Sequence, residues 1–125
     1  MRKPILCLDW DGVIHSYVSG WKGAHVCDDD PVPGAIQFLQ DALQHFRVAI
    51  FSSRSNQEGG IAAMQIALTE WAAIYAKDQA WLAEIEWPTE KPPAFLTIDD
   101  RALTFDGTWP SIESLKAFQP WNKRT

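Results

Sequence analysis

The sequence predicts a single three-layer α/β domain with a mostly parallel central sheet and helices on both faces. Its length of 125 residues is that of one domain, so we assign residues 1–125 to it. Short apolar runs of strand length each end in polar residues, and longer segments with helical spacing separate them. Strands that alternate with helices along the chain are typical of parallel sheets.

The composition narrows the classes of partner. Hydrophobic residues make up 46% and charged residues 22% of the chain, as in globular proteins. A net charge of −5 argues against nucleic-acid or membrane binding through bulk charge. The apolar run Ile5–Leu8 is too short for a signal peptide, and no run approaches the roughly 20 residues of a membrane span. We therefore expect a cytoplasmic protein with no membrane partner.

The first half of the chain predicts one strand, one loop and one helix. The continuous apolar run Ile5–Leu8 is typical of a strand covered on both faces. Residues 13–31 have no sustained periodicity and are interpreted as a flap or irregular loop. The segment from Val32 to Phe46 predicts an amphipathic helix, because apolar residues recur at helical spacing: Ile36, Leu39, Leu43 and Phe46.

The second half predicts a second strand, Val48–Phe51, and then a long helix. Apolar residues at spacings of three and four run from Ile61 to Tyr75, and we expect a break near Lys77–Gln79. Three short elements complete the prediction, namely a third strand, a fourth strand and a hairpin around an Asp-Gly turn: Ile85–Trp87, Phe95–Ile98 and Arg101–Trp109.

Polar residues follow each of the main predicted strands, where ligands bind in parallel sheets. Two aspartates follow the first strand, two serines and an arginine follow the second, and an aspartate pair follows the last. A lysine precedes the last strand in a proline-rich loop. These candidates are Asp9, Asp11, Ser52, Ser53, Arg54, Lys91, Asp99 and Asp100.

The chemistry of these residue types indicates a cation and an anionic ligand. Asp9 and Asp11 project to the same side of the extended chain, and Gly12 allows a sharp turn after them. Four carboxylates at one edge would repel each other unless a cation neutralises them, and hard oxygen ligands suit Mg²⁺. Ser52 and Lys91 supply donors and positive charge, for which phosphate is the natural ligand.

Four ordered motifs in residues 5–101 resemble the haloacid dehalogenase superfamily. Asp9-Trp10-Asp11-Gly12-Val13 resembles its first motif, DxDG[TV], and the apolar strand ending at Ser52 resembles the second. Lys91 matches the lysine of the third motif, and Thr97-Ile98-Asp99-Asp100-Arg101 matches the acidic pair of the fourth. Ser52-x-Arg54 and the residues around Asp99 are similar to small phage-type members and to polynucleotide 3′-phosphatase domains.

The resemblance implies a Rossmann-like domain without a separate cap and a Mg²⁺-dependent phosphomonoesterase. Asp9 would be the nucleophile that forms an aspartyl-phosphate, and Asp11 would be the general acid and base. Ser52 and Lys91 would hold the phosphoryl oxygens, with Ser53 and Arg54 as further substrate-binding candidates. Mg²⁺ would be held by Asp9, the Asp11 backbone carbonyl and the acidic pair, with Asp100 as the direct ligand and Asp99 either behind the direct ligands or bridged to the ion by water.

Several alternatives stay open at this point. A phospho-accepting receiver-like domain has similar residues in a different order, and an inactive binding domain could share the fold. The phosphorylated substrate could be a small metabolite or a nucleic-acid 3′ end. Arg54 and Arg101 could contact substrate or pair with local carboxylates, and Trp21 could stack on a base or sugar or pack within the flap. The sequence does not predict an oligomeric state.

Overall fold

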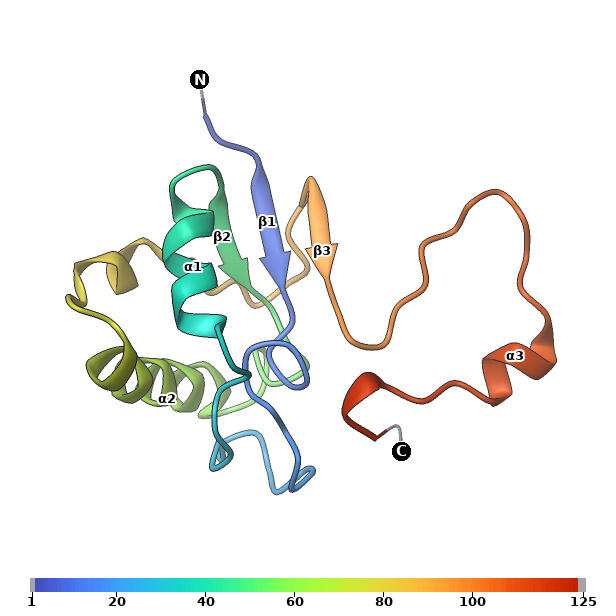
Figure 1. Cartoon of the computed structure of the whole chain (residues 1–125), viewed down its shortest axis with the longest axis horizontal. Helices are drawn as coiled ribbons and strands as arrows, with labels where there is room; N and C mark the ends of the chain where they lie inside the picture. The colour runs from blue at the N-terminus through green and yellow to red at the C-terminus, as the bar shows by residue number, and fades with distance from the viewer. Residues whose placement is uncertain (1, 124–125) are drawn as a thin grey trace.

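A computed structural model, which describes residues 2–123, shows a three-stranded parallel sheet (Figure 1). Strand β1 (Ile5–Leu8) lies in the centre, between β2 (Arg47–Ile50) and β3 (Leu96–Ile98). In the register of the sheet, Cys7 lies opposite both Ala49 and Thr97. The predicted α/β class with a parallel sheet is therefore confirmed.

Two helices follow the first two strands. Helix α1 (Ala35–Leu43) packs on β2, and α2 (Gly60–Tyr75) packs on α1. The predicted break after the second helix is also confirmed, because α2 ends at Tyr75 and the 3-10 helix η1 (Ala80–Glu84) begins five residues later. Near the C-terminus, α3 (Ile112–Lys116) and the 3-10 helix η2 (Trp121–Lys123) were not predicted from the sequence.

The hydrophobic core joins the strands to these two helices. Its members include Leu8 of β1, Leu39 of α1 and Met64 of α2, each at most 1% exposed. Trp10 is fully buried directly beyond β1, and its ring stacks on Trp71 of α2 with the centroids 5.4 Å apart. The core therefore fixes the backbone on either side of Trp10, where the candidate site begins.

Residues 13–31 form an irregular loop, as expected. The loop contains no helix or strand, but its ends are closed by hydrogen bonds from Ser16 N–H to Asp30 O (2.9 Å) and from Val32 N–H to Ile14 O (2.8 Å). We call residues 13–31 the flap.

Two of the predicted short elements differ in the structure. Within Ile85–Trp87, only Glu86 pairs with the sheet, through a single parallel bridge to Ala49. The predicted hairpin Arg101–Trp109 was wrong, since no strand is formed there. The Asp106 side chain still accepts a turn hydrogen bond from Thr108 N–H (2.9 Å), but the flanking residues pack on no core face, and a lone hairpin is marginal in water.

None of the helices within residues 2–123 is long and apolar enough to cross a membrane.

Truncation of Leu39, a core residue of α1, should reveal how much the packing of α1 contributes to the free energy of unfolding. Leu39 is fully buried, so Leu39→Ala should lower the free energy of unfolding by about 2–5 kcal/mol through lost contacts and a cavity. Ile74→Ala, at a position 70% exposed on α2, is the matched control and should change it by less than about 0.5 kcal/mol. Urea denaturation measures both, and equal losses would show that α1 is not part of the core.

Candidate functional site

Three predicted acidic residues converge beyond the carboxyl ends of β1 and β3. Asp9 follows β1 directly, and its backbone N–H donates to Ile98 O of β3 (3.0 Å), which ties the two strand ends together. One carboxylate oxygen from each of Asp9, Asp99 and Asp100 lies within 4.8 Å of the other two. Such a set of hard oxygen donors fits a divalent cation such as Mg²⁺.

The Asp9 carboxylate is in an unfavourable environment for a negative charge. Burial raises the pKa of Asp9 to about 8, and the charges of Asp99 and Asp100 add to this effect, against the hydrogen bond that Asp9 accepts from Trp10 N–H (2.8 Å). Burial also raises the pKa of Asp100. A cation bound among the three carboxylates would favour the ionised form of Asp9 at neutral pH.

Gly12 allows the loop after β1 to pass close to this cluster. Its φ is +80°, and a Cβ at this position would overlap the Asp100 carboxylate. Its carbonyl oxygen accepts a hydrogen bond from Trp121 Nε1 of η2 (2.7 Å). Only glycine at position 12 leaves room for the Asp100 carboxylate to lie against the loop that carries Asp9 and Asp11.

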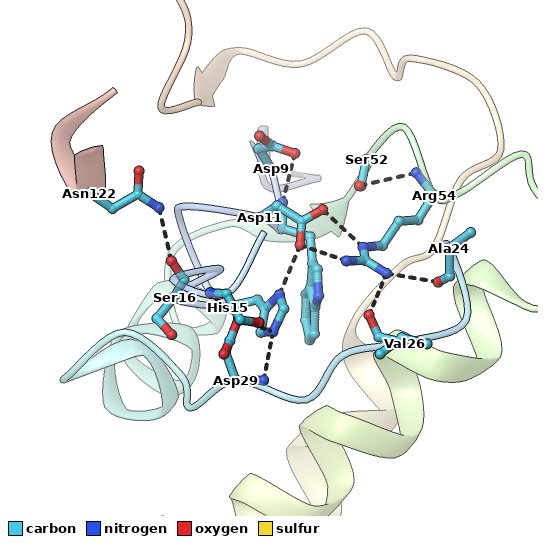
Figure 2. A network of polar contacts seen from close by, with 12 residues as sticks. Asp9, Asp11, His15, Ser16, Ala24, Val26, Asp29, Ser52, Arg54 and Asn122 are labelled. Atoms are coloured by element: carbon cyan, nitrogen blue, oxygen red, sulfur yellow. Dashed lines mark hydrogen bonds and ion pairs between the residues drawn. The ribbon is translucent and has the colours of Figure 1, made fainter. Parts of the chain in front are cut away.

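Asp11 faces a different set of partners from Asp9, as Figure 2 shows. Arg54 donates to both of its carboxylate oxygens, from Nε (2.9 Å) and from Nη2 (3.1 Å), and His15 Nδ1 lies 2.8 Å from Oδ1. Burial alone would raise the pKa of Asp11, but the hydrogen bonds from His15 and Arg54 lower it overall. Asp11 is therefore ionised in this arrangement, and its side chain is not part of the three-carboxylate cluster.

Arg54 is fully buried and connects the end of β2 to the flap. Besides Asp11, its guanidinium contacts three flap carbonyls through Nη1, those of Gly23, Ala24 and Val26 at 2.8–2.9 Å. Gly60, the first residue of α2, leaves room for this turn, because a Cβ there would overlap the Arg54 carbonyl oxygen. Of the two roles left open for Arg54, the structure shows the pairing with a local carboxylate.

His15 is a functional candidate that the sequence did not reveal. It is 1% exposed, and its Nε2 accepts a hydrogen bond from Asp29 N–H (3.1 Å). Because Nε2 is an acceptor, the ring proton must be on Nδ1, from which it is donated to Asp11. The only sequence signal is the four-residue spacing from Asp11, which is too common by itself to identify a site.

The serines after β2 form a tight turn beside Asp11. Ser52 is buried, its Oγ accepts from Arg54 N–H (3.2 Å), and its own N–H donates to Ser55 Oγ (2.9 Å). Ser52 can still donate its hydroxyl hydrogen. Ser53 is exposed at the site.

Lys91 has an exposed side chain, and among residues 2–123 it forms no ion pair with a carboxylate. Burial and the charge of Asp9 raise the pKa of Cys7, and the Lys91 ammonium partly opposes this rise. Lys91 does not line the hollow that opens over the acidic residues.

A small hollow of about 180 Å³ opens over the acidic residues. Its floor includes Asp9, Asp11 and Asp100, and Ser53 contributes a hydroxyl. Two aromatic residues of the flap, Tyr17 and Trp21, lie at its rim. Arg101, from the segment after β3, adds a positive charge there. The Trp21 ring is 49% exposed, with its centroid 4.8 Å from Arg54 Cζ. The flap therefore lies over the site, as expected.

The comparisons with known proteins identify no relative. A scan against protein-family models, a search of the curated proteins and a search of the solved structures each returned no match. The function must therefore be inferred from the site itself.

Replacing Arg54 should destabilise the whole site. Arg54→Met leaves the largely buried Asp11 carboxylate and three flap carbonyls without their donor, so we expect a loss of about 3–5 kcal/mol in the free energy of unfolding. Arg101→Met, at a side chain 59% exposed, is the control and should leave the unfolding midpoint unchanged. Chemical denaturation measures both. A stable Arg54→Met protein with a protected flap in hydrogen exchange would contradict this account.

The raised pKa of Asp9 predicts a pH dependence of stability without divalent cations. Because the folded state holds the Asp9 proton up to about pH 8 and the unfolded chain releases it near pH 4, stability should fall as pH rises between these values. Melting temperatures measured in EDTA should decrease across this window, and Asp9→Asn should remove most of the decrease. Asp41→Asn, on the exposed face of α1, should retain it. The same slope in all three proteins would show that Asp9 is not the titrating group.

Proposed function

We propose that this protein is a Mg²⁺-dependent phosphomonoesterase of the haloacid dehalogenase type, on a capless Rossmann-like domain with helices on both sheet faces. One observation carries the proposal. The carboxylates of Asp9, Asp99 and Asp100 meet at the carboxyl ends of parallel strands, where Asp9 and Asp100 line an open hollow together with Ser53. The order of the four sequence motifs supports it.

Mg²⁺ would be held by Asp9, the Asp11 backbone carbonyl and Asp100, with Asp99 behind these ligands or bridged to the ion by water. When bound, the ion would neutralise part of the charge on the carboxylates and on the transferring phosphoryl group. The three carboxylates of the cluster are not balanced by nearby positive side chains. Among residues 2–123, the one ion pair that the cluster forms joins Arg101 Nε to Asp100 Oδ2 at 3.9 Å.

Asp9 is suited to be the nucleophile. Its side chain lines the hollow, and the Trp10 N–H fixes the position of one carboxylate oxygen. Attack on phosphorus would give an aspartyl-phosphate and release the alcohol. Buried backbone on both sides of Asp9, at Leu8 and Trp10, holds the carboxylate in place during attack.

Asp11 is placed to act as the general acid and base. Its ionised form, which Arg54 and His15 maintain, is the form that removes a proton from the water that hydrolyses the aspartyl-phosphate. Protonation of the leaving alkoxide requires Asp11 to carry a proton first. A phosphate group in the hollow would raise the pKa of Asp11 by its negative charge and so supply that form.

Three further side chains would bind the phosphoryl oxygens. Ser52 donates its remaining hydroxyl hydrogen, and Ser53 already lines the hollow. Lys91 would offer its exposed ammonium to the bound phosphate dianion.

The substrate is either a small phosphorylated metabolite or a nucleic-acid 3′ end. The hollow has room for a phosphate group, and the half-exposed Trp21 on its rim offers a flat surface to the leaving group. The net charge of −5 disfavours a broad nucleic-acid footprint, although not the binding of one strand end.

Phosphate release from a substrate panel tests the proposal. The panel combines phosphorylated metabolites with a 3′-phosphorylated oligonucleotide, in Mg²⁺ and in EDTA. We expect turnover of at least one class that EDTA abolishes and that Asp9→Asn lowers by about 10³-fold or more, because the variant lacks the nucleophile. Asp41→Asn, the same change on the exposed face of α1, should leave the rate unchanged.

The other outcomes separate the alternatives. A long-lived phosphoprotein formed in stoichiometric amount, with no phosphate release, would indicate a receiver-like domain. Neither release nor phosphoprotein with any substrate would indicate a binding domain. Full activity of Asp9→Asn would overturn the assignment of the nucleophile, and full activity in EDTA would overturn that of the metal.

A further inference from the structure

Residues 102–118 expose an unusual amount of apolar surface. We call this segment the C-terminal arm, and Figure 1 shows it bowed away from the sheet and from α1. Trp109 is 83% exposed, and its ring pairs with that of Phe105 at 4.7 Å between centroids. Helix α3 adds Ile112 and Leu115, which together with the two rings line an open hollow of about 860 Å³. Apolar patches of this kind mark interaction surfaces.

A second apolar surface lies on the body of the same chain. It is a groove of about 380 Å³ between β3 and the start of α1, and we call it the β3–α1 groove. Leu8 and Ile98 form its strand side, and Phe38, which is 45% exposed, forms its helix side. Beside it, β3 is exposed along its length and is an edge strand of the sheet among residues 2–123. Exposed edges of this kind are normally covered or paired.

The arm contributes no residue to the lining of this groove. At its start, Asp99 accepts a hydrogen bond from Arg101 N–H (2.8 Å). Beyond its end, Trp121 Nε1 donates to Gly12 O (2.7 Å) and Asn122 Nδ2 donates to Ser16 O (3.0 Å). With the segment after it tied to Gly12 and Ser16, the arm projects outward between β3 and η2 and leaves the chain's own groove uncovered (Figure 1).

We propose that the arm of one copy docks in the β3–α1 groove of a second copy, and that the second arm does the same in return. Both surfaces are on one chain, so a two-fold axis satisfies them together and closes the assembly. Each arm carries three exposed aromatic rings, those of Phe105, Trp109 and Phe118. Three aliphatic side chains of the arm, those of Leu103, Ile112 and Leu115, are 43–68% exposed and add to this apolar area. Together the exposed parts of these six side chains in two arms, with the groove surfaces that cover them, reach the roughly 1,200 Å² of a specific interface.

Dimerisation of this kind would also affect the candidate site, because the chain after the arm contacts it. The segment after the arm contacts Gly12, directly after Asp11, and Ser16 near the start of the flap. The proposal does not depend on the proposed phosphatase activity, because it rests on the arm and the groove alone.

The molar mass of the full chain in solution, measured by light scattering after size exclusion, tests the proposal. We expect twice the chain mass for the wild type. Trp109→Ser on the arm and Phe38→Ser at the groove should each weaken the dimer by about tenfold or more, because each removes a central aromatic contact. Ile74→Ser, at an equally apolar position 70% exposed on α2, should leave the dimer unchanged. Circular dichroism checks that all variants are folded.

Two results would overturn the proposal. One is a monomeric wild type from micromolar to submillimolar concentration, which would mean that the arm closes on its own chain or binds another protein. The other is a dimer that persists unchanged in both Trp109→Ser and Phe38→Ser, which would place the interface elsewhere.

Discussion

The ion pair between the buried Arg54 guanidinium and the Asp11 carboxylate is the interaction on which the site depends. It joins the end of β2 to the loop after β1, and the same guanidinium fixes three carbonyls of the flap. A buried guanidinium is stable only where its donors are satisfied, so strand, loop and flap must adopt one mutual arrangement. Gly60 and Gly12 permit this arrangement, because side chains there would overlap Arg54 and Asp100.

The same interaction separates two aspartates that are only two residues apart. Asp9 is partly buried near other carboxylates and holds its proton to about pH 8, whereas Asp11 is held ionised by Arg54 and His15. Two carboxyl groups whose pKa values are moved in opposite directions can take different roles in one reaction. In the proposed mechanism, Asp9 would require a cation to become a nucleophile, and Asp11 would require the phosphate of a substrate to become an acid. Both requirements would be met only when metal and substrate are bound together.

Much of the fold could be predicted because local patterns determine it. The apolar runs at Ile5–Leu8 and Val48–Phe51 and the helical spacing from Ile61 to Tyr75 correspond to β1, β2 and α2, and the acidic cluster follows from the geometry of parallel strands. The role of His15 and the partners of Arg54 could not be predicted, since they depend on contacts between residues far apart in sequence. The Asp106-Gly107 hairpin failed because a turn sequence does not supply the face against which strands must pack.

The central claim is that Asp9 carries the phosphoryl group during turnover. The most direct measurement is to quench a reaction during turnover, reduce any acyl phosphate with borohydride and locate the reduced residue by peptide mass spectrometry. The account predicts reduction at Asp9 in the presence of substrate and Mg²⁺, and none when either is omitted. Reduction at Asp11 instead, or sustained phosphate release with no reducible intermediate at Asp9, would contradict it.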